Sequence, residues 1–304
     1  MRLISRILKG LLALIVIAIV GAALWLYFAP PDLIRVATGY SAKIVCSNVF
    51  VAGREAQRVL ELDVQAPGHP ILKFVSVDID ADDGTASAAL LGIFGRSTAV
   101  ARDGYGCASV PDGNLGALAP LPAVDGTAPL TTGIWPEGIA VEPSQDPEVV
   151  RILDDPAMTG LGMRAVVVVK NGRIVGERYG DGFTLKTPLL GWSMTKSVNA
   201  AIIGTAVKAG KLALDKAPVF PEWASDNRAA IKLSDLMAMS SGLEFNEDYG
   251  DVTDVTRMLY LEPDMAGFAG SKPATASPGE VFNYSSGTAV LLSRSWQDPL
   301  GGDA

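Results

Sequence analysis

The chain of 304 residues carries 33 acidic and 25 basic side chains, which gives a net charge of −8 at neutral pH. Nucleic-acid binding draws its affinity from clustered lysine and arginine, so this charge balance argues against nucleic acid as a partner. Hydrophobic residues make up 49% of the chain and charged residues 19%, and we therefore expect packed domains rather than disorder.

The amino terminus predicts a membrane anchor. Three basic residues within residues 1–9 precede an uncharged, apolar run over residues 10–31. About 20 apolar residues cover the hydrocarbon core of a bilayer, and Trp25 near the far end suits the membrane interface. The basic flank should stay cytoplasmic, which would place the remaining chain outside. The alternatives are a long signal peptide cleaved after Ala29, or a buried core helix.

Two cysteines, Cys46 and Cys107, follow the predicted anchor. An even number of cysteines in an exported segment favours a disulfide, and the alternative is two buried free thiols. The single histidine, His69, lies in a turn-like sequence between prolines, and we assign it no chemistry. With one histidine and no Cys-x-x-Cys motif, we expect no metal site.

Residues 32–111 predict a small β-rich region. Strand-like sequence covers residues 71–79, 86–93 and 97–101, with turn signals between the first two. Residues 112–146 are rich in proline and glycine and have little periodicity, which is typical of a linker or of an extended segment that wraps across a neighbouring domain.

A further domain is predicted over residues 147–304. Residues 164–179 read as a β-hairpin closed by Asn171-Gly172, a dipeptide that favours a tight primed turn. After Trp192, apolar and small residues recur at three- and four-residue steps until Gly210, so a helix is expected there. A second, short helix is expected over residues 233–239.

Ser193 and Lys196 form a Ser-x-x-Lys motif at the start of the first of these helices. Residues three apart share a helix face, so the lysine amine can reach the serine hydroxyl. A desolvated lysine can hold its amine neutral and remove the serine proton, and the helix amino terminus stabilises negative charge on a substrate oxygen. The alternative is a serine cap followed by a surface lysine.

Tyr284, in the run Tyr284-Ser285-Ser286, is a second candidate for chemistry. A tyrosine hydroxyl near the serine and lysine could relay a proton to a leaving group. Taken alone, Tyr284 is more typical of a half-buried strand or loop residue.

Four stretches together carry a resemblance. They are 192–197 (WSMTKS), 210–215 (GKLALD), 231–243 (IKLSDLMAMSSGL) and 278–287 (PGEVFNYSSG). In order and spacing they are similar to the class C β-lactamase-like, penicillin-recognising serine hydrolases. The resemblance implies an α+β domain of the β-lactamase/transpeptidase type, with an antiparallel sheet and helices.

The resemblance also implies a mechanism without a metal or organic cofactor. Ser193 would attack a small amide or ester, Lys196 would be its base, and Tyr284 would protonate the leaving group. Residues 246–249 (NEDY) resemble the 6-aminohexanoate-dimer (nylon oligomer) hydrolase branch, which implies that Tyr249 helps to bind substrate. The alternative for Tyr249 is an aromatic residue on a surface loop. Ser286 stands where many members carry asparagine, which favours esterases or amidases over β-lactam recognition.

The family's third motif, usually Lys-Thr-Gly or His-x-Gly on a strand lining the site, normally lies far downstream, and the chain stops at Ala304. We therefore expect a C-terminally truncated form of the domain. The competing functions are a non-catalytic, membrane-anchored remnant that binds peptidoglycan peptides or a protein partner, and a cell-wall DD-peptidase. The expected location is the bacterial inner membrane, crossed once, with residues 147–304 in the periplasm. The sequence leaves the oligomeric state open.

Overall fold

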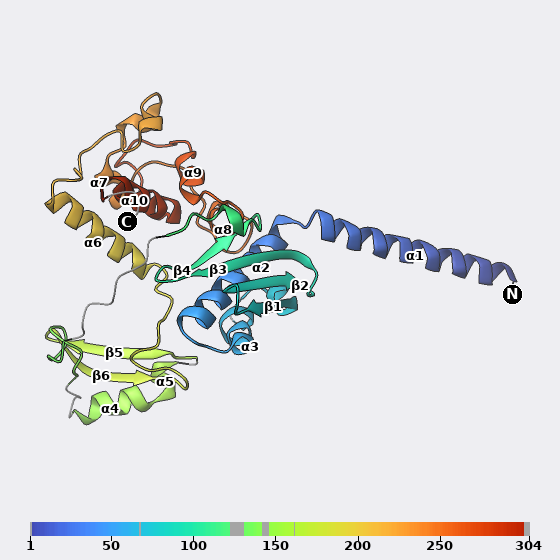
Figure 1. The fold of residues 1–304 in the computed structure, drawn as a ribbon, viewed down its shortest axis with the longest axis horizontal. Helices are drawn as coiled ribbons and strands as arrows, with labels where there is room; N and C mark the ends of the chain where they lie inside the picture. The colour runs from blue at the N-terminus through green and yellow to red at the C-terminus, as the bar shows by residue number, and fades with distance from the viewer. Residues whose placement is uncertain (1, 67, 122–130, 142–145, 161, 301–304) are drawn as a thin grey trace. The chain divides into compact units, whose positions relative to one another are not determined.

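We describe the protein from a computed structural model, which describes residues 2–66, 68–121, 131–141, 146–160 and 162–300. By its internal contacts the chain divides into two compact units, one made of residues 1–123 and 190–304 and the other of residues 124–189. Both units contain helices and antiparallel strands (Figure 1). The predicted α+β class is therefore confirmed.

The first unit begins with the long helix α1 (Arg2–Phe28). Residues 6–28 have a mean hydropathy of 2.7 over their most apolar window, and none of that window is buried in the protein. Apolar side chains such as Leu8 and Trp25 are accordingly exposed. This one helix is long and apolar enough to cross a membrane, as predicted, and the direction in which it would cross stays a prediction.

Helix α2 (Asp32–Cys46) follows, and it was not among the predicted elements. Short helical segments continue as far as residue 74: η1 (Ser47–Val51), α3 (Ala56–Val59), η2 (Leu60–Gln65) and η3 (Pro70–Phe74). The strand predicted over 71–79 therefore begins later than expected. Pro70 opens a tight helical turn, and His69 accepts a hydrogen bond from the Ile71 amide at 3.2 Å, which caps that turn.

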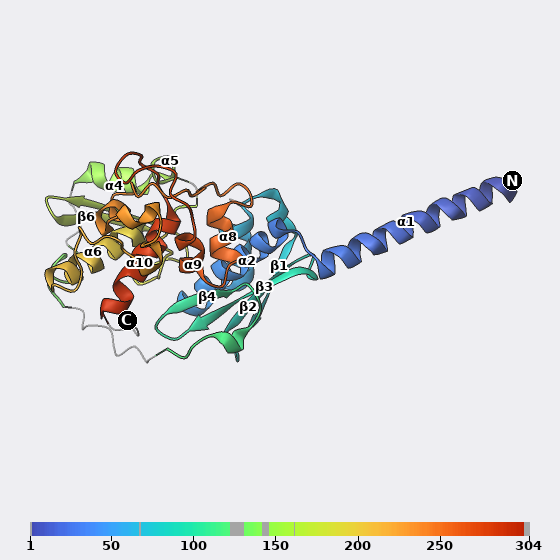
Figure 2. The same ribbon diagram turned by 90° about the horizontal axis from the view of Figure 1, so that it is seen from above.

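A four-stranded antiparallel meander packs against α2 (Figures 1 and 2). Its strands, in sheet order, are β1 (Val75–Asp80), β2 (Thr85–Leu90), β3 (Phe94–Arg102) and β4 (Gly106–Val110). The three predicted strands are thus present as β1, β2 and β3, and β4 is an additional strand. A disulfide joins Cys46 at the end of α2 to Cys107 on β4, so the bridge rather than the pair of free thiols is the arrangement found.

The second unit contains α4 (Pro147–Asp154), α5 (Pro156–Thr159) and the hairpin of β5 (Ala165–Lys170) and β6 (Arg173–Tyr179). Asn171 and Gly172 both have positive φ, 52° and 71°, so the predicted primed turn is confirmed. The predicted linker 112–146 falls in part outside the described residues, at 122–130 and 142–145; η4 (Leu115–Ala117) lies in its described part.

The remainder of the first unit is helical. Its elements are α6 (Met194–Lys208), η5 (Pro221–Trp223), η6 (Asn227–Ala230), α7 (Leu233–Met237), α8 (Asp254–Tyr260), α9 (Met265–Gly270) and α10 (Ser286–Leu300). The helices predicted after Trp192 and over 233–239 are confirmed as α6 and α7. Helix α10 packs against α6, α7 and α9 (Figure 1). The core at this packing includes Trp223 and Leu291.

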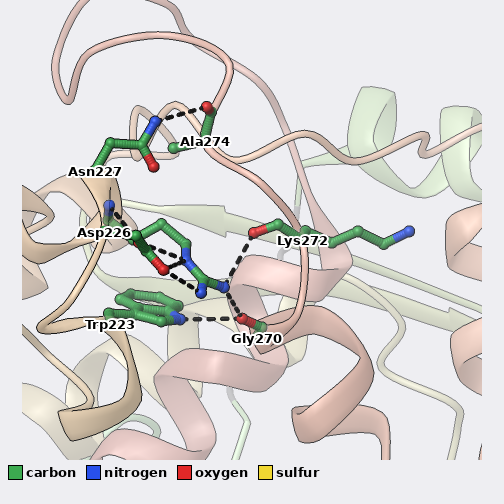
Figure 3. A network of polar contacts seen from close by, with 7 residues as sticks. Trp223, Asp226, Asn227, Gly270, Lys272 and Ala274 are labelled. Carbon is green, nitrogen blue, oxygen red and sulfur yellow. Dashed lines mark hydrogen bonds and ion pairs between the residues drawn. The ribbon is translucent and has the colours of Figure 1, made fainter.

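A polar network fixes the segment that leads to the site. Figure 3 shows the Trp223 indole donating to the Gly270 carbonyl, at 3.0 Å, and the Asn227 amide donating to the Ala274 carbonyl. Arg228 also donates to the Gly270 carbonyl and pairs with Asp226, which lowers the pKa of that carboxyl to about 2. The chain between α9 and α10 is therefore tied to the body of the unit.

Candidate active site

A strained turn presents Ser193. Trp192 adopts a left-handed backbone with φ of 44°. Residues other than glycine rarely take this conformation, and those that do are often found at functional sites. Two bonds to the Trp192 carbonyl, from the Thr195 amide at 3.1 Å and the Thr195 hydroxyl at 2.6 Å, hold the turn. Ser193 occupies the amino-terminal cap position of α6, with an exposed side chain and an amide that precedes the first helical turn.

Lys196 connects the predicted residues to one another. Its Nζ lies 3.4 Å from the Ser193 hydroxyl oxygen and 3.3 Å from the Ser286 hydroxyl oxygen. It also lies over the Tyr284 ring, 4.9 Å from the centroid. One turn of α6 brings the amine to the serine, and the packing of α10 against α6 brings Ser286 to the amine.

Ser286 is the most buried of these side chains, with 9% of its surface exposed. Its amide donates to one carboxylate oxygen of Glu247 at 2.7 Å, and its hydroxyl donates to the other. Because a carboxylate only accepts, the Ser286 oxygen is left to accept hydrogen bonds from Lys196 and from the Tyr249 hydroxyl, at 3.5 Å. The four groups thus form one connected set.

Glu247 is a residue that the sequence analysis did not single out. It lies in the loop that also holds Tyr249, and its carboxylate caps the amino terminus of α10 through the Ser286 amide. The signal available in the sequence was an acidic residue in the NEDY run. Its partner is 39 positions away, and no local pattern indicates such a pairing.

Tyr284 stands beside the nucleophile. A hydrogen bond with Ser193, followed by the hydrogen bond and positive charge of Lys196, lowers the pKa of the Tyr284 hydroxyl below its ordinary 10.0. Desolvation has the opposite effect on Tyr249 and raises its pKa. The two tyrosines therefore differ in acidity, and Tyr284 is the better proton donor of the pair.

Loop contacts hold Tyr284 in place. The Asn283 side-chain amide donates to the Phe245 carbonyl at 3.3 Å, and the Asn283 backbone amide donates to the Met239 carbonyl at 2.8 Å. The Ser285 hydroxyl accepts from the Thr288 amide at 3.0 Å and caps α10. The structure thus brings together Ser193, Lys196, Tyr284, Tyr249 and Ser286, the five residues singled out from the sequence.

The described residues contain no group of three or more histidine, cysteine, aspartate or glutamate side chains that could hold a metal ion.

Residues 154–295 match the model of the Beta-lactamase family. This match supports the predicted resemblance to a serine β-lactamase-like family. The four stretches of sequence that carry the resemblance lie within residues 154–295, as do the five site residues and Glu247.

A candidate 6-aminohexanoate-dimer hydrolase from Bacillus anthracis is among the similar solved structures. It is 23% identical to this chain, with a TM-score of 0.37, and the alignment covers 45% of this chain. This chain spans 40% of that protein's length. No curated protein matches the sequence.

Proposed function

We propose that this protein hydrolyses small amides or esters through an acyl-enzyme on Ser193. The observation that carries the proposal is the position of the Lys196 amine, 3.4 Å from the Ser193 hydroxyl oxygen and 3.3 Å from that of Ser286, within a β-lactamase-family segment. A positioned amine next to a serine is the arrangement that nucleophilic catalysis by serine requires.

In the proposed reaction the Ser193 oxygen attacks the carbonyl carbon of the substrate while the Lys196 amine takes the hydroxyl proton. The carbonyl oxygen becomes an oxyanion, and the Ser193 amide, at the positive end of α6, donates to it. The bond to the leaving group then breaks. Tyr284 supplies the proton that the leaving nitrogen or oxygen needs, and the proton that Lys196 took from Ser193 passes to the Tyr284 oxygen, which restores both groups. Water later attacks the acyl-enzyme carbonyl and gives a proton to the Lys196 amine. The bond to Ser193 then breaks, the same proton passes to the serine oxygen, and the acid is released.

The remaining site residues position the base. Ser286 accepts from Lys196, so one amine hydrogen is directed away from Ser193, and Glu247 holds Ser286 in the orientation that permits this. Tyr249 is half exposed and reaches Ser286 from the loop, a position from which it could also contact the substrate amide. Glu247 is therefore proposed as a positioning residue, and Tyr249 and Ser286 as substrate-binding residues.

We propose that α1 anchors the protein in the bacterial inner membrane with the site on the periplasmic side. The apolar span over residues 6–28 and the basic residues at the amino end of α1 support this orientation. The disulfide between Cys46 and Cys107 agrees with an oxidising compartment.

The test uses the full chain in lipid nanodiscs with p-nitrophenyl acetate and a matching anilide. Ser193→Ala should lower kcat/KM by about 10³-fold or more, and Lys196→Met should do the same. Ser197→Ala and Lys208→Met, at exposed positions on the same helix, are the matched controls and should keep wild-type rates. A fluorophosphonate probe should label the wild-type protein and not Ser193→Ala.

Undiminished turnover in Ser193→Ala would reject the acyl-enzyme. Labelling of wild-type protein without any turnover of amides or esters would instead favour a non-catalytic binding protein. Release of D-alanine from peptidoglycan peptides would assign the same site to a DD-peptidase.

A further inference from the structure

A cavity of about 470 Å³ opens at the candidate nucleophile. Trp192 and Ser193 line one side of it, and helix α2 lines another. All of its lining residues belong to the first unit, so the amino-terminal region and the region that carries Ser193 build the cavity together. Cavities of this size that are mostly apolar, with a few polar groups, are typical of small-molecule sites.

The α2 side of the cavity is one face of the helix. Leu33, Val36, Ala37 and Tyr40 recur at the three- and four-residue spacing that places side chains in a row. Other residues of α2 pack against the sheet and are buried there. In this contact the Thr38 hydroxyl donates a hydrogen bond to the carbonyl of Gly95 on β3, at 2.6 Å. Helix α2 thus has two apolar faces, of which one packs on the sheet and the other faces the cavity.

Contacts with α8 keep this helix in place. Arg257 on α8 donates to Asp32 at the start of α2, at 2.7 Å. The rings of Tyr40 and Tyr260 meet edge to face, 6.0 Å apart. A side chain at Gly39 would come within 3.0 Å of the Tyr260 β-carbon, so the two helices approach closely because position 39 is glycine. The α2 side of the cavity is therefore held in place by its contacts with α8.

Several polar side chains in the lining bond to neighbouring backbone. The His69 ring nitrogen Nδ1 accepts from the Ile71 amide. The Thr256 hydroxyl donates to the Asp251 carbonyl at 2.8 Å, and the Asp251 carboxylate accepts from the Val252 amide at 2.7 Å. These groups are engaged in their own turns, which leaves apolar surface as the main feature that the cavity offers to a ligand.

We propose that this cavity binds the acyl group of the substrate, and that the preferred acyl group is an unbranched aliphatic chain of about eight carbons, as suits a cavity of this volume. The inference rests on the proposed function, because it takes Ser193 as the attacking group. It deepens that function by naming the substrate class, medium-chain acyl esters and amides. It also makes α2, which lies outside the β-lactamase-family segment, a determinant of specificity.

The first test compares kcat/KM for p-nitrophenyl octanoate and p-nitrophenyl acetate, using the full chain in nanodiscs. Each buried methylene contributes about fourfold, so the octanoate-to-acetate ratio of the wild-type protein should be about tenfold or more. Ala37→Phe adds a ring to the α2 face and should lower that ratio about tenfold. Ala209→Phe adds the same ring at the exposed end of α6 and should leave the ratio unchanged.

The ratio is taken within each variant, so a general loss of activity does not affect it. If Ala37→Phe does not fold, Leu33→Ala replaces it, because the loss of a lining side chain should lower the ratio about fourfold or more. A wild-type ratio of one or less, or a ratio that Ala37→Phe and Leu33→Ala leave unchanged, would overturn the inference while the proposed hydrolysis stands.

A binding measurement separates this inference from the proposed function. Ser193→Ala protein is titrated calorimetrically with N-octanoylglycine and N-acetylglycine, and the octanoyl compound should bind about tenfold more tightly or better. Adding Ala37→Phe to Ser193→Ala should remove that difference, whereas adding Ala209→Phe should keep it, which controls for partition into the nanodisc. Equal affinity for the two compounds would overturn the inference, whatever the outcome of the turnover assays.

Discussion

The Glu247 carboxylate accepts hydrogen bonds from both polar groups of Ser286, from the backbone amide at 2.7 Å and from the hydroxyl at 2.5 Å. This pairing leaves the Ser286 oxygen as an acceptor for Lys196. The orientation of the proposed base therefore depends on a loop carboxylate that does not itself contact Ser193.

Replacing Glu247 should affect catalysis through this pairing. Glu247→Gln removes a charged acceptor, and a hydrogen bond to a charged group contributes about 1.5–3 kcal/mol, so kcat/KM should fall about tenfold or more. The negative charge of Glu247 also raises the pKa of Tyr284, so its removal should move the alkaline limb of the pH–rate profile to lower pH.

The matched control is Glu244→Gln, an exposed carboxylate three positions away in the same loop. It should reproduce the wild-type rate and pH profile. If Glu247→Gln lowered the melting temperature but left kcat/KM and the alkaline limb unchanged, Glu247 would be a helix cap and no more.

The proposed role of Tyr284 as proton donor predicts a second effect of pH on activity. A proton donor acts only while protonated, so activity should fall as the pH rises through the pKa of the Tyr284 hydroxyl. Hydrogen bonding with Ser193 and the charge of Lys196 lower that pKa, so the midpoint of the fall should lie below pH 10.0, the ordinary tyrosine value. The pH dependence of kcat/KM for an anilide substrate measures it.

Tyr284→Phe should lower kcat by about 10²-fold and lose the alkaline limb, because the donor is gone. Tyr27→Phe, an exposed position on α1, should leave rate and profile unchanged. An alkaline limb that survives in Tyr284→Phe would assign the titration to another group.

Alanine substitutions at Gly242 and Gly210 should differ in their effect on the free energy of unfolding, although the two glycines have similar φ angles. Gly242 has φ of 79°, and a β-carbon there would lie 2.1 Å from the Ala276 carbonyl oxygen. Gly210, with φ of 70°, has open space around it. Gly210→Ala should cost about 1 kcal/mol through its left-handed backbone alone, whereas Gly242→Ala should cost about 3 kcal/mol or more through strain and overlap.

Urea unfolding followed by tryptophan fluorescence measures both variants. Equal losses of stability in the two variants would contradict the close approach of the Gly242 backbone to the Ala276 carbonyl.

Local chemistry made several elements predictable. The Asn171-Gly172 turn follows from its sequence, because both positions require positive φ and the dipeptide tolerates it. Helix α6 follows from apolar periodicity that ends at Gly210. The Ser-x-x-Lys spacing similarly implies that Lys196 reaches Ser193, since one helical turn separates them. In each case the decisive contacts lie within a few residues.

The sequence by itself determined the membrane-length helix, the hairpin, the two helices, the preference for a disulfide and the serine–lysine pair. Only the tertiary structure decided that Glu247 binds Ser286 and that the α2 face at Leu33 and Ala37 lines a cavity at Ser193. The reason is that a carboxylate in a loop, or an apolar stripe on a helix, has the same local sequence whether it faces water, a core or a site. What it faces is set by packing between segments that lie 39 to about 160 positions apart in the chain.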